Sequence, residues 1–456
     1  MNETKKTLIF GGAAVALALL AFITAPKRVT PGAFLDKGEL FFPDFTDPNT
    51  ATTLEVIDYD EETGAAKPFK VTFKDGRWTI PSHHDYPADG KDRLAKTAAG
   101  VLVLRKDDFR SDNVSDYEAC GVIDPLDETS AALKGRGKRV IIKGKNDQVL
   151  ADIIIGKKIE GRDKFRFVRI PDQKRIYAAR VDLNISTEFS DWIEKDLLEI
   201  NKDDIKQVVL KDYSINEATG TVNQRDVLIL DKKDDVWKAN RMAANQEVDQ
   251  TKMSSLLSAL DNLSIVGVRP KPGGLSRSLR KESNGISITQ QAVLSLQSKG
   301  YYFTRDGQLL SNEGELKART KDGVTYTLRF GEIVYGSGEA VTAGTETDGN
   351  KKSGPGENRY LFITTDFDAT QFKEPSKPKN TDFANKPDSL WTDADRKNKE
   401  LQNEHDKWQE KIDKGQKISD DLNARFARWY YVISAKSFDK LHLKRKELMK
   451  KKEKTT

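Results

Sequence analysis

The stretches DQVLADIIIG (147–156) and DGVTYTLRFG (322–331) decide the expected fold, because they align without a gap over their whole length. Asp147 matches Asp322 at their starts, Gly156 matches Gly331 at their ends, and the apolar residues between them stay in register. Internal similarity of this kind indicates that a structural unit occurs more than once in a chain. We therefore expect two homologous domains, each containing this segment.

The segments upstream of these stretches also resemble each other. Residues 54–78 and 205–237 each predict a strand, a polar turn and a second strand that ends in tryptophan, Trp78 or Trp237. An aspartate follows each tryptophan after a short loop, Asp89 or Asp249, in a position to cap a helix. Apolar residues at helical spacing predict the core-facing side of each helix. These residues are Leu94, Ala98, Val101 and Leu102 in the first helix and Met253, Leu256, Leu257, Leu260 and Leu263 in the second.

Downstream, KFRFVRI (164–170) resembles NRYLFIT (358–364), and RIYAARVDLNISTEF (175–189) resembles RWYYVISAKSF (428–438). The growing spacing between matched residues predicts insertions in the second copy at about 276–314 and 373–425. The expected fold class is α+β: an N-terminal transmembrane helix, then two homologous, mostly antiparallel β-sheet domains, each with a packed helix. The predicted boundaries are an anchor at 1–28, a first domain at 29–200, a second at 201–449 and a basic tail at 450–456.

The expected anchor is TLIFGGAAVALALLAFITA (7–25), a run without any charged residue. As a helix it is about 28 Å long, close to the hydrocarbon thickness of a bilayer. A cleaved signal peptide is the alternative, because Lys5 and Lys6 precede the run and small residues end it. Pro26 directly after Ala25 argues against cleavage there. We expect a single-pass anchor in the inner membrane with the bulk of the chain in the periplasm, although the flanking basic residues nearly balance.

The insertion at 373–425 predicts a helical hairpin that projects from the second domain. Three prolines suggest an extended lead-in, and Thr392 with Asp395 three residues later can start a helix. Leu401, His405, Trp408 and Ile412 then form one stripe, and a second stripe follows Gly415. The first stripe either packs on its own domain or binds a partner, so its four residues are the candidate partner-binding residues.

Composition argues against several classes of function. The chain has 456 residues, and its 76 Lys+Arg and 71 Asp+Glu leave a net charge of +5, largely from residues 436–456, so no broad nucleic-acid surface is expected. One cysteine excludes an internal disulfide, and four histidines make a multi-histidine metal centre unexpected. His83 and His84 form either a capping loop or part of a metal site. No P-loop, nucleophile elbow or zinc-protease helix occurs, so we expect no catalytic residue, cofactor or metal.

The basic C-terminal segment is a candidate lipid-binding element, because lysine and arginine near an anionic membrane each contribute on the order of 1 kcal/mol. A solvated end of the chain is the alternative explanation. The candidate lipid-binding residues are Lys444, Arg445, Lys446, Lys450, Lys451 and Lys452.

The chain resembles the bacterial domain-of-unknown-function family numbered 4340, particularly long members from planctomycete-like genomes. The resemblance rests on IPSHHDYPADGKDRLAKTA (80–98), DYEACGVIDP (116–125), the glycine that ends Ile153 to Gly156, and FARWYYVISAKSFDKL (426–441). Members often occur near components of gliding-motility-type ABC transport systems. The resemblance implies an accessory role at the envelope, and it implies no catalytic residues.

The expected function is therefore that of a non-enzymatic, membrane-anchored accessory or scaffold protein with a protein partner in an ABC-type envelope complex. The alternative is a module that binds a glycan or peptide in a groove between the two copies. An envelope hydrolase that uses scattered carboxylates is a third hypothesis, which a cleft with two facing carboxylates would support.

Overall fold

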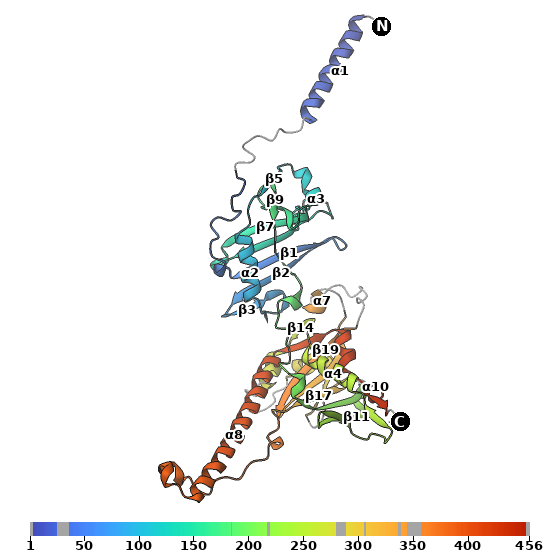
Figure 1. Cartoon of the computed structure of the whole chain (residues 1–456). Helices are drawn as coiled ribbons and strands as arrows, with labels where there is room; N and C mark the ends of the chain where they lie inside the picture. The colour runs from blue at the N-terminus through green and yellow to red at the C-terminus, as the bar shows by residue number, and fades with distance from the viewer. Residues whose placement is uncertain are drawn as a thin grey trace. The chain divides into compact units, whose positions relative to one another are not determined.

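The computed structural model describes residues 3–24, 36–183, 185–216, 219–279, 289–304, 307–335, 339–343 and 357–452. Its contacts divide the chain into two compact units (Figure 1). Unit 1 comprises Met1–Lys70 and Asp92–Thr187, and unit 2 comprises Val71–Lys91 and Glu188–Thr456. Two parts of the first predicted insertion, residues 280–288 and 305–306, and the last four residues of the predicted basic tail lie outside the described residues.

The first sheet has nine strands in the order β4-β3-β2-β1-β6-β7-β8-β9-β5, and the strand pairs with a described register are antiparallel. Helix α2 (Lys91–Leu102) separates β4 from β5 in the sequence. The strands are β1 (Thr53–Asp60), β2 (Ala65–Lys74), β3 (Arg77–Ile80), β4 (Tyr86–Pro87), β5 (Asp108–Ser111), β6 (Lys138–Lys143), β7 (Val149–Lys158), β8 (Phe165–Arg169) and β9 (Ile176–Arg180).

The second sheet has eight antiparallel strands in the order β12-β11-β10-β17-β18-β19-β20-β14. Counted from β3 and from β12, the two sheets have the same order of neighbouring strands, and in both the strand after the helix lies at the far edge. The strands are β10 (Ile205–Asn216), β11 (Thr221–Lys233), β12 (Val236–Ala239), β14 (Gly267–Pro270), β17 (Glu315–Thr320), β18 (Val324–Ile333), β19 (Arg359–Phe367) and β20 (Trp429–Ile433).

The matched stretches of the sequence occupy equivalent strands. Val149 begins β7 and Val324 begins β18. Strand β7 pairs antiparallel with β6, and β18 pairs antiparallel with β17. Consecutive residues of β18 point to opposite faces of the sheet, and several consecutive residues are buried. This pattern is expected for a strand that is covered on both faces. The aligned apolar positions thus form the centre of each sheet.

The two predicted core helices bury all but one of the side chains that their spacing indicated, the exception being Leu102, which is half-buried. Leu94, Ala98 and Val101 of α2 are buried, and so are the five apolar residues predicted for α4 (Gln250–Asp261) and the turn after it. Asp249 caps α4 as expected, accepting hydrogen bonds from the backbone amides of Thr251 and Lys252. Helix α2 begins at Lys91, so Gly90 rather than Asp89 directly precedes it.

Helix α1 (Glu3–Thr24) covers most of the stretch predicted to span a membrane, and its side chains are described from Phe10 to Leu20. Ala25, the last residue of the predicted span, lies outside the described residues. Within the part of the chain that the structure describes, no helix combines the length and the apolar character needed to cross a membrane.

The predicted helical hairpin is wrong, because residues Asp393–Phe426 form one continuous helix, α8. Thr392 and Asp395 start it through the reciprocal capping contacts that the sequence indicated. Gly415 does not reverse the chain direction. It lets the helix pass close to the ring of Phe367, and a Cβ atom at this position would lie only 2.7 Å from the carbonyl oxygen of Asp322.

Replacing Gly415 with alanine should therefore lower the stability of unit 2, although alanine is the better helix former by about 1 kcal/mol. The crowding at Phe367 and Asp322 should outweigh that gain, with a net loss of about 1–3 kcal/mol. Urea denaturation followed by tryptophan fluorescence measures this, because all six tryptophans lie in unit 2. The exposed neighbour Gln416 provides the control variant Gln416→Ala. Equal or greater stability of Gly415→Ala would contradict the argument.

Candidate functional site

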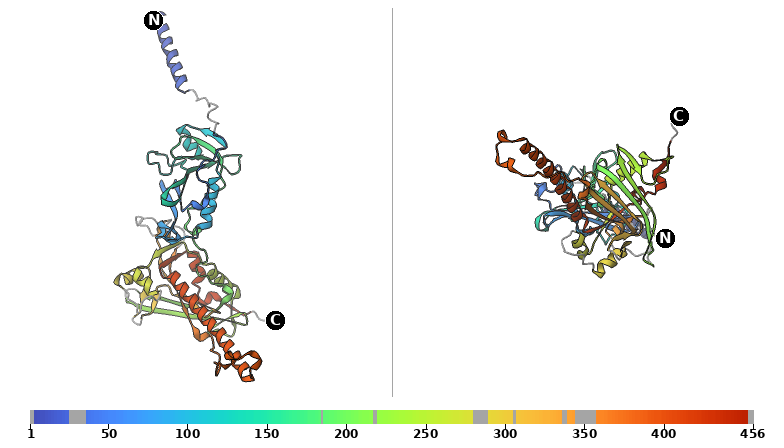
Figure 2. Two further views of the ribbon diagram at one scale, coloured as in Figure 1. Left: turned by 90° about the vertical axis from the view of Figure 1, so that its left-hand side faces the viewer. Right: turned by 90° about the horizontal axis from the view of Figure 1, so that it is seen from below.

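The most distinctive feature of unit 2 is an arm, which we define as residues 372–412. It consists of an irregular lead-in, residues 372–392, and the first half of α8. Figures 1 and 2 show this half of α8 extending past the strands of unit 2 in every view. The second half of the helix, residues 413–426, packs on β18 and β19, and we call it the root of the arm. The arm is thus a helical projection whose root is packed on the sheet.

The lead-in runs back along the helix and bonds to it through side chains of α8. The indole Nε1 of Trp408 donates a hydrogen bond to the carbonyl oxygen of Phe372 at 3.1 Å. The amide of Asn398 accepts from the backbone N of Lys379 at 3.2 Å and donates to Asn380 at 3.0 Å. These contacts cover the side of the helix that carries the predicted stripe.

The four predicted partner-binding residues, Leu401, His405, Trp408 and Ile412, are all half-buried. His405 lies 5.2 Å from Trp408 between ring centres, and its Nε2 is 3.5 Å from a carboxylate oxygen of Glu374 in the lead-in. The stripe therefore meets the chain's own lead-in along part of its surface. A partner of the free protein would meet the opposite, charged side of the helix or the tip of the arm.

The tip of the arm is held by a compact set of polar and aromatic contacts. Lys386 Nζ lies 3.1 Å from both carboxylate oxygens of Asp395. Hydrogen bonds from Thr392 and from Lys386 lower the pKa of Asp395 to about 2. The indole of Trp391 donates to the carbonyl oxygen of Phe383 at 3.1 Å, and Leu390 beside it is 67% exposed. No local pattern indicated that Leu390 would be exposed, because the turn that exposes it is held by the contacts of Trp391 with Phe383 and of Lys386 with Asp395.

The root of the arm covers part of β19. Strand β20 pairs with β19 only at Arg359 to Leu361. Beyond Leu361 no described strand continues this pairing, and α8 lies against this part of β19. The side-chain amide of Asn423 pairs with both backbone groups of Thr365, at 2.9 and 2.6 Å. The Thr365 hydroxyl donates to the carbonyl oxygen of Ser419 at 2.8 Å. These buried contacts satisfy the strand edge and fix the direction of α8.

The basic C-terminal segment is partly built into the fold. Strand β21 (Met449–Lys451) pairs with β13 (Gln246–Val248), after the short helix α10 (Arg445–Leu448). The Arg445 guanidinium contacts Asp226 at 2.7 Å, which holds the pKa of that carboxyl below its usual range. Lys450 is paired with Glu247 at 3.3 Å. The other candidate lipid-binding residues, Lys444, Lys446, Lys451 and Lys452, have exposed side chains.

An open groove of about 590 Å³ lies in unit 2. Its lining comprises Ser190, Asp191, Lys195, Asp196, Asp261, Asn262 and Ser264. Burial raises the pKa of Asp196, although Arg425 opposes this shift. Among the described residues, no group of three or more His, Cys, Asp or Glu side chains is arranged to hold a metal ion.

The two adjacent histidines have separate partners. His83 is buried, stacks on Phe189 with ring centres 4.4 Å apart, and exchanges a hydrogen bond with Ser82 at 2.9 Å. The exposed His84 lies 2.7 Å from the carbonyl oxygen of Ala343 through its Nε2. Burial lowers the pKa of His83 to about 4, and this environment suits a neutral packing residue. Cys120 is also buried, and burial raises the pKa of its thiol.

Comparison with known families gives one match, which begins at Trp78 in β3 and ends within α5 (Gly273–Leu279). Residues 78–278 match the family described as Domain of unknown function (DUF4340). This match confirms the family expected from the sequence over these residues. No curated protein and no solved structure is significantly similar to the chain. The DUF4340 match ends before α8, so the arm lies outside it.

Proposed function

We propose that the protein is a membrane-anchored, extracytoplasmic accessory or scaffold protein without enzymatic activity, and that it binds a component of an ABC-type envelope complex through its arm. The observation that carries this proposal is the arm itself, a helical projection whose root is fixed by buried contacts to Thr365. Holding such a projection in one direction reduces the entropy lost when a partner binds.

The anchor in this proposal rests on the uncharged run from Thr7 to Ala25 and on the helical conformation of α1 over most of it. In this proposal the chain that follows the run lies in the periplasm. The ABC-type partner is suggested by the family resemblance alone.

We also infer that the two sheets descend from one ancestral unit that was duplicated in tandem. The equivalent strand order of the two sheets and the aligned strands β7 and β18 support this inference. In this account α8 and the segment that contains α5 and α6 (Gln290–Gln297) are additions to the second copy.

Site-specific photocrosslinking in cells tests the role of the arm. A photoreactive amino acid at the exposed arm residue Glu404 or Lys411 should capture a membrane transport component. The same group at Lys238, an exposed residue of β12, is the control and should capture far less of it. Equal capture from both sites, or none from the arm in cells that contain the protein at a high level, would contradict the proposal.

A further inference from the structure

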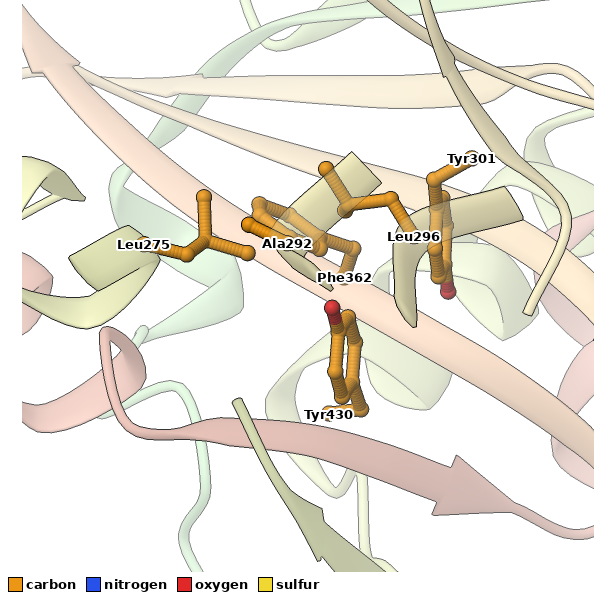
Figure 3. Close-up of a cluster of buried hydrophobic side chains, with 6 residues drawn as sticks. All are labelled: Leu275, Ala292, Leu296, Tyr301, Phe362 and Tyr430. Atoms are coloured by element: carbon orange, nitrogen blue, oxygen red, sulfur yellow. The ribbon is translucent and has the colours of Figure 1, made fainter. Parts of the chain in front are cut away.

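A layer of inserted elements covers one end of the sheet of unit 2. We define this insertion layer as residues 273–279, 289–304 and 307–311, which include α5, α6, β15 (Tyr301–Phe303) and β16 (Leu309–Ser311). Figure 3 shows its side chains around Phe362 of β19 and Tyr430 of β20. The layer contributes Leu275, Ala292, Leu296 and Tyr301 to this cluster, and all six side chains are at most 2% exposed.

Lys271 lies against the same two rings. It follows β14 directly, and it is only 6% exposed. Its Nζ is 3.9 Å from the ring centre of Phe362 and 5.5 Å from that of Tyr430. Within the described part of the chain, no carboxylate pairs with this amine. Such a residue is unusual, because a lysine removed from water is normally paired with an acid.

The amine of Lys271 also contacts the root of the arm. Its Nζ donates a hydrogen bond at 3.0 Å to the carbonyl oxygen of Phe426, which is the last residue of α8. The final carbonyls of a helix have no partner within the helix, and a side-chain donor at this end satisfies one of them. The backbone N of Lys271 donates a second hydrogen bond, at 2.7 Å, to the carbonyl oxygen of Arg428, which lies just after α8.

We infer that Lys271 couples the insertion layer to the root of the arm, because one side chain rests on the rings that the layer covers and caps the last turn of α8. Loosening the insertion layer should therefore free the last turn of α8, and removing the amine should free both. This inference goes beyond the proposed function, since it holds whether or not the arm binds a partner.

The charges around Lys271 agree with this role. Burial lowers the pKa of Lys271 well below its ordinary value, and the nearby cation Arg329 of β18 adds to the effect. A second lysine, Lys299, follows α6, and its Nζ lies 5.0 Å from the ring centre of Tyr430. The amine can donate the hydrogen bond to Phe426 in either protonation state.

Hydrogen exchange of the full chain, resolved by peptide, tests the coupling. In Lys271→Met, amides of residues 423–427 and of α6 should exchange about tenfold faster, as expected for the loss of one buried hydrogen bond. Amides of β10 should keep their protection and serve as the internal reference. Lys417→Met is the matched control, because it makes the same replacement on α8 itself at a side chain that is 75% exposed. It should leave the exchange rates of residues 423–427 unchanged.

A second variant keeps the inference testable if Lys271→Met does not fold. Leu296→Ala opens the insertion layer without touching α8, and it should accelerate exchange in both α6 and residues 423–427. Faster exchange in α6 with unchanged exchange at residues 423–427 would overturn the inference. Unchanged exchange at residues 423–427 in a folded Lys271→Met chain would also overturn it. Neither readout requires a partner, so a failure of the crosslinking experiment would leave this test intact.

Discussion

Replacing Glu315 with glutamine is expected to lower the free energy of unfolding of unit 2 by about 2–4 kcal/mol, because it leaves three partly buried cations without a counter-charge. The Glu315 side chain is 3% exposed at the start of β17. Its carboxylate lies 2.7 Å from Lys211 Nζ and 3.3 Å from Arg329 Nε, and a third cation, Lys317, is 3.7 Å away.

The charge state of Glu315 follows from these neighbours. Burial alone would raise the pKa of its carboxyl, but Arg329, Lys211 and Lys317 together hold the pKa below its ordinary value. The carboxylate is therefore charged at neutral pH. A glutamine of the same shape keeps the packing and removes the charge, so the three cations then repel one another in a poorly hydrated environment.

Urea denaturation at pH 7, followed by tryptophan fluorescence, measures the loss in unit 2. Glu313→Gln is the matched control, because Glu313 precedes the strand, is 34% exposed and contacts only Arg359 among the described cations. It should change stability by less than about 1 kcal/mol. The double variant Glu315→Gln/Lys317→Gln should recover part of the loss, since it removes one of the repelling charges. A Glu315→Gln effect no larger than that of Glu313→Gln would show that the network contributes little.

Local patterns predicted the parts of this fold whose cause is local. The aligned segments around Asp147 and Asp322 identified equivalent strands, and helical spacing identified the buried sides of α2 and α4. The capping pair Thr392 and Asp395 also fixed the start of α8. The helical spacing and the capping pair depend on residues within about four positions of one another, and the alignment compares two short continuous segments.

The errors concern contacts between distant residues. Gly415 suggested a helix end, because glycine is a weak helix former, but its role is to admit the ring of Phe367 from another element. The stripe from Leu401 to Ile412 correctly indicated a half-buried side, yet the sequence could not show that the irregular lead-in covers it. The capping contact between Lys271 and Phe426 joins residues far apart in the chain, so no local pattern could have revealed it.

The stability of unit 2 should also fall as the solution is acidified from pH 6.5 to about 4, and His83 should account for a distinct share of the fall. Its pKa is about 4 in the folded chain, mainly because of burial, with smaller contributions from His84 and Arg269. An unfolded histidine has a pKa of about 6.5. Between these values the unfolded chain binds a proton that the folded chain does not, so acidification favours unfolding. The share of His83 reaches about 3 kcal/mol at pH 4 and levels off within about one pH unit below it.

His83→Phe removes this titration and retains an aromatic ring to stack on Phe189. Its stability should exceed that of the unmodified chain by an amount that grows between pH 6.5 and pH 4, as measured by urea denaturation at a series of pH values. Ser82→Ala removes the hydrogen bond to the histidine ring but leaves the ring in place, so it should retain the pH dependence of the unmodified chain. Carboxylates with lowered pKa values, such as Asp395 at about 2, lose their contribution to stability as the pH falls toward those values. They are present in all three chains, so they do not contribute to the difference between them. If His83→Phe and Ser82→Ala show the same slope between pH 6.5 and pH 4, the buried ring is not the group that unfolding protonates.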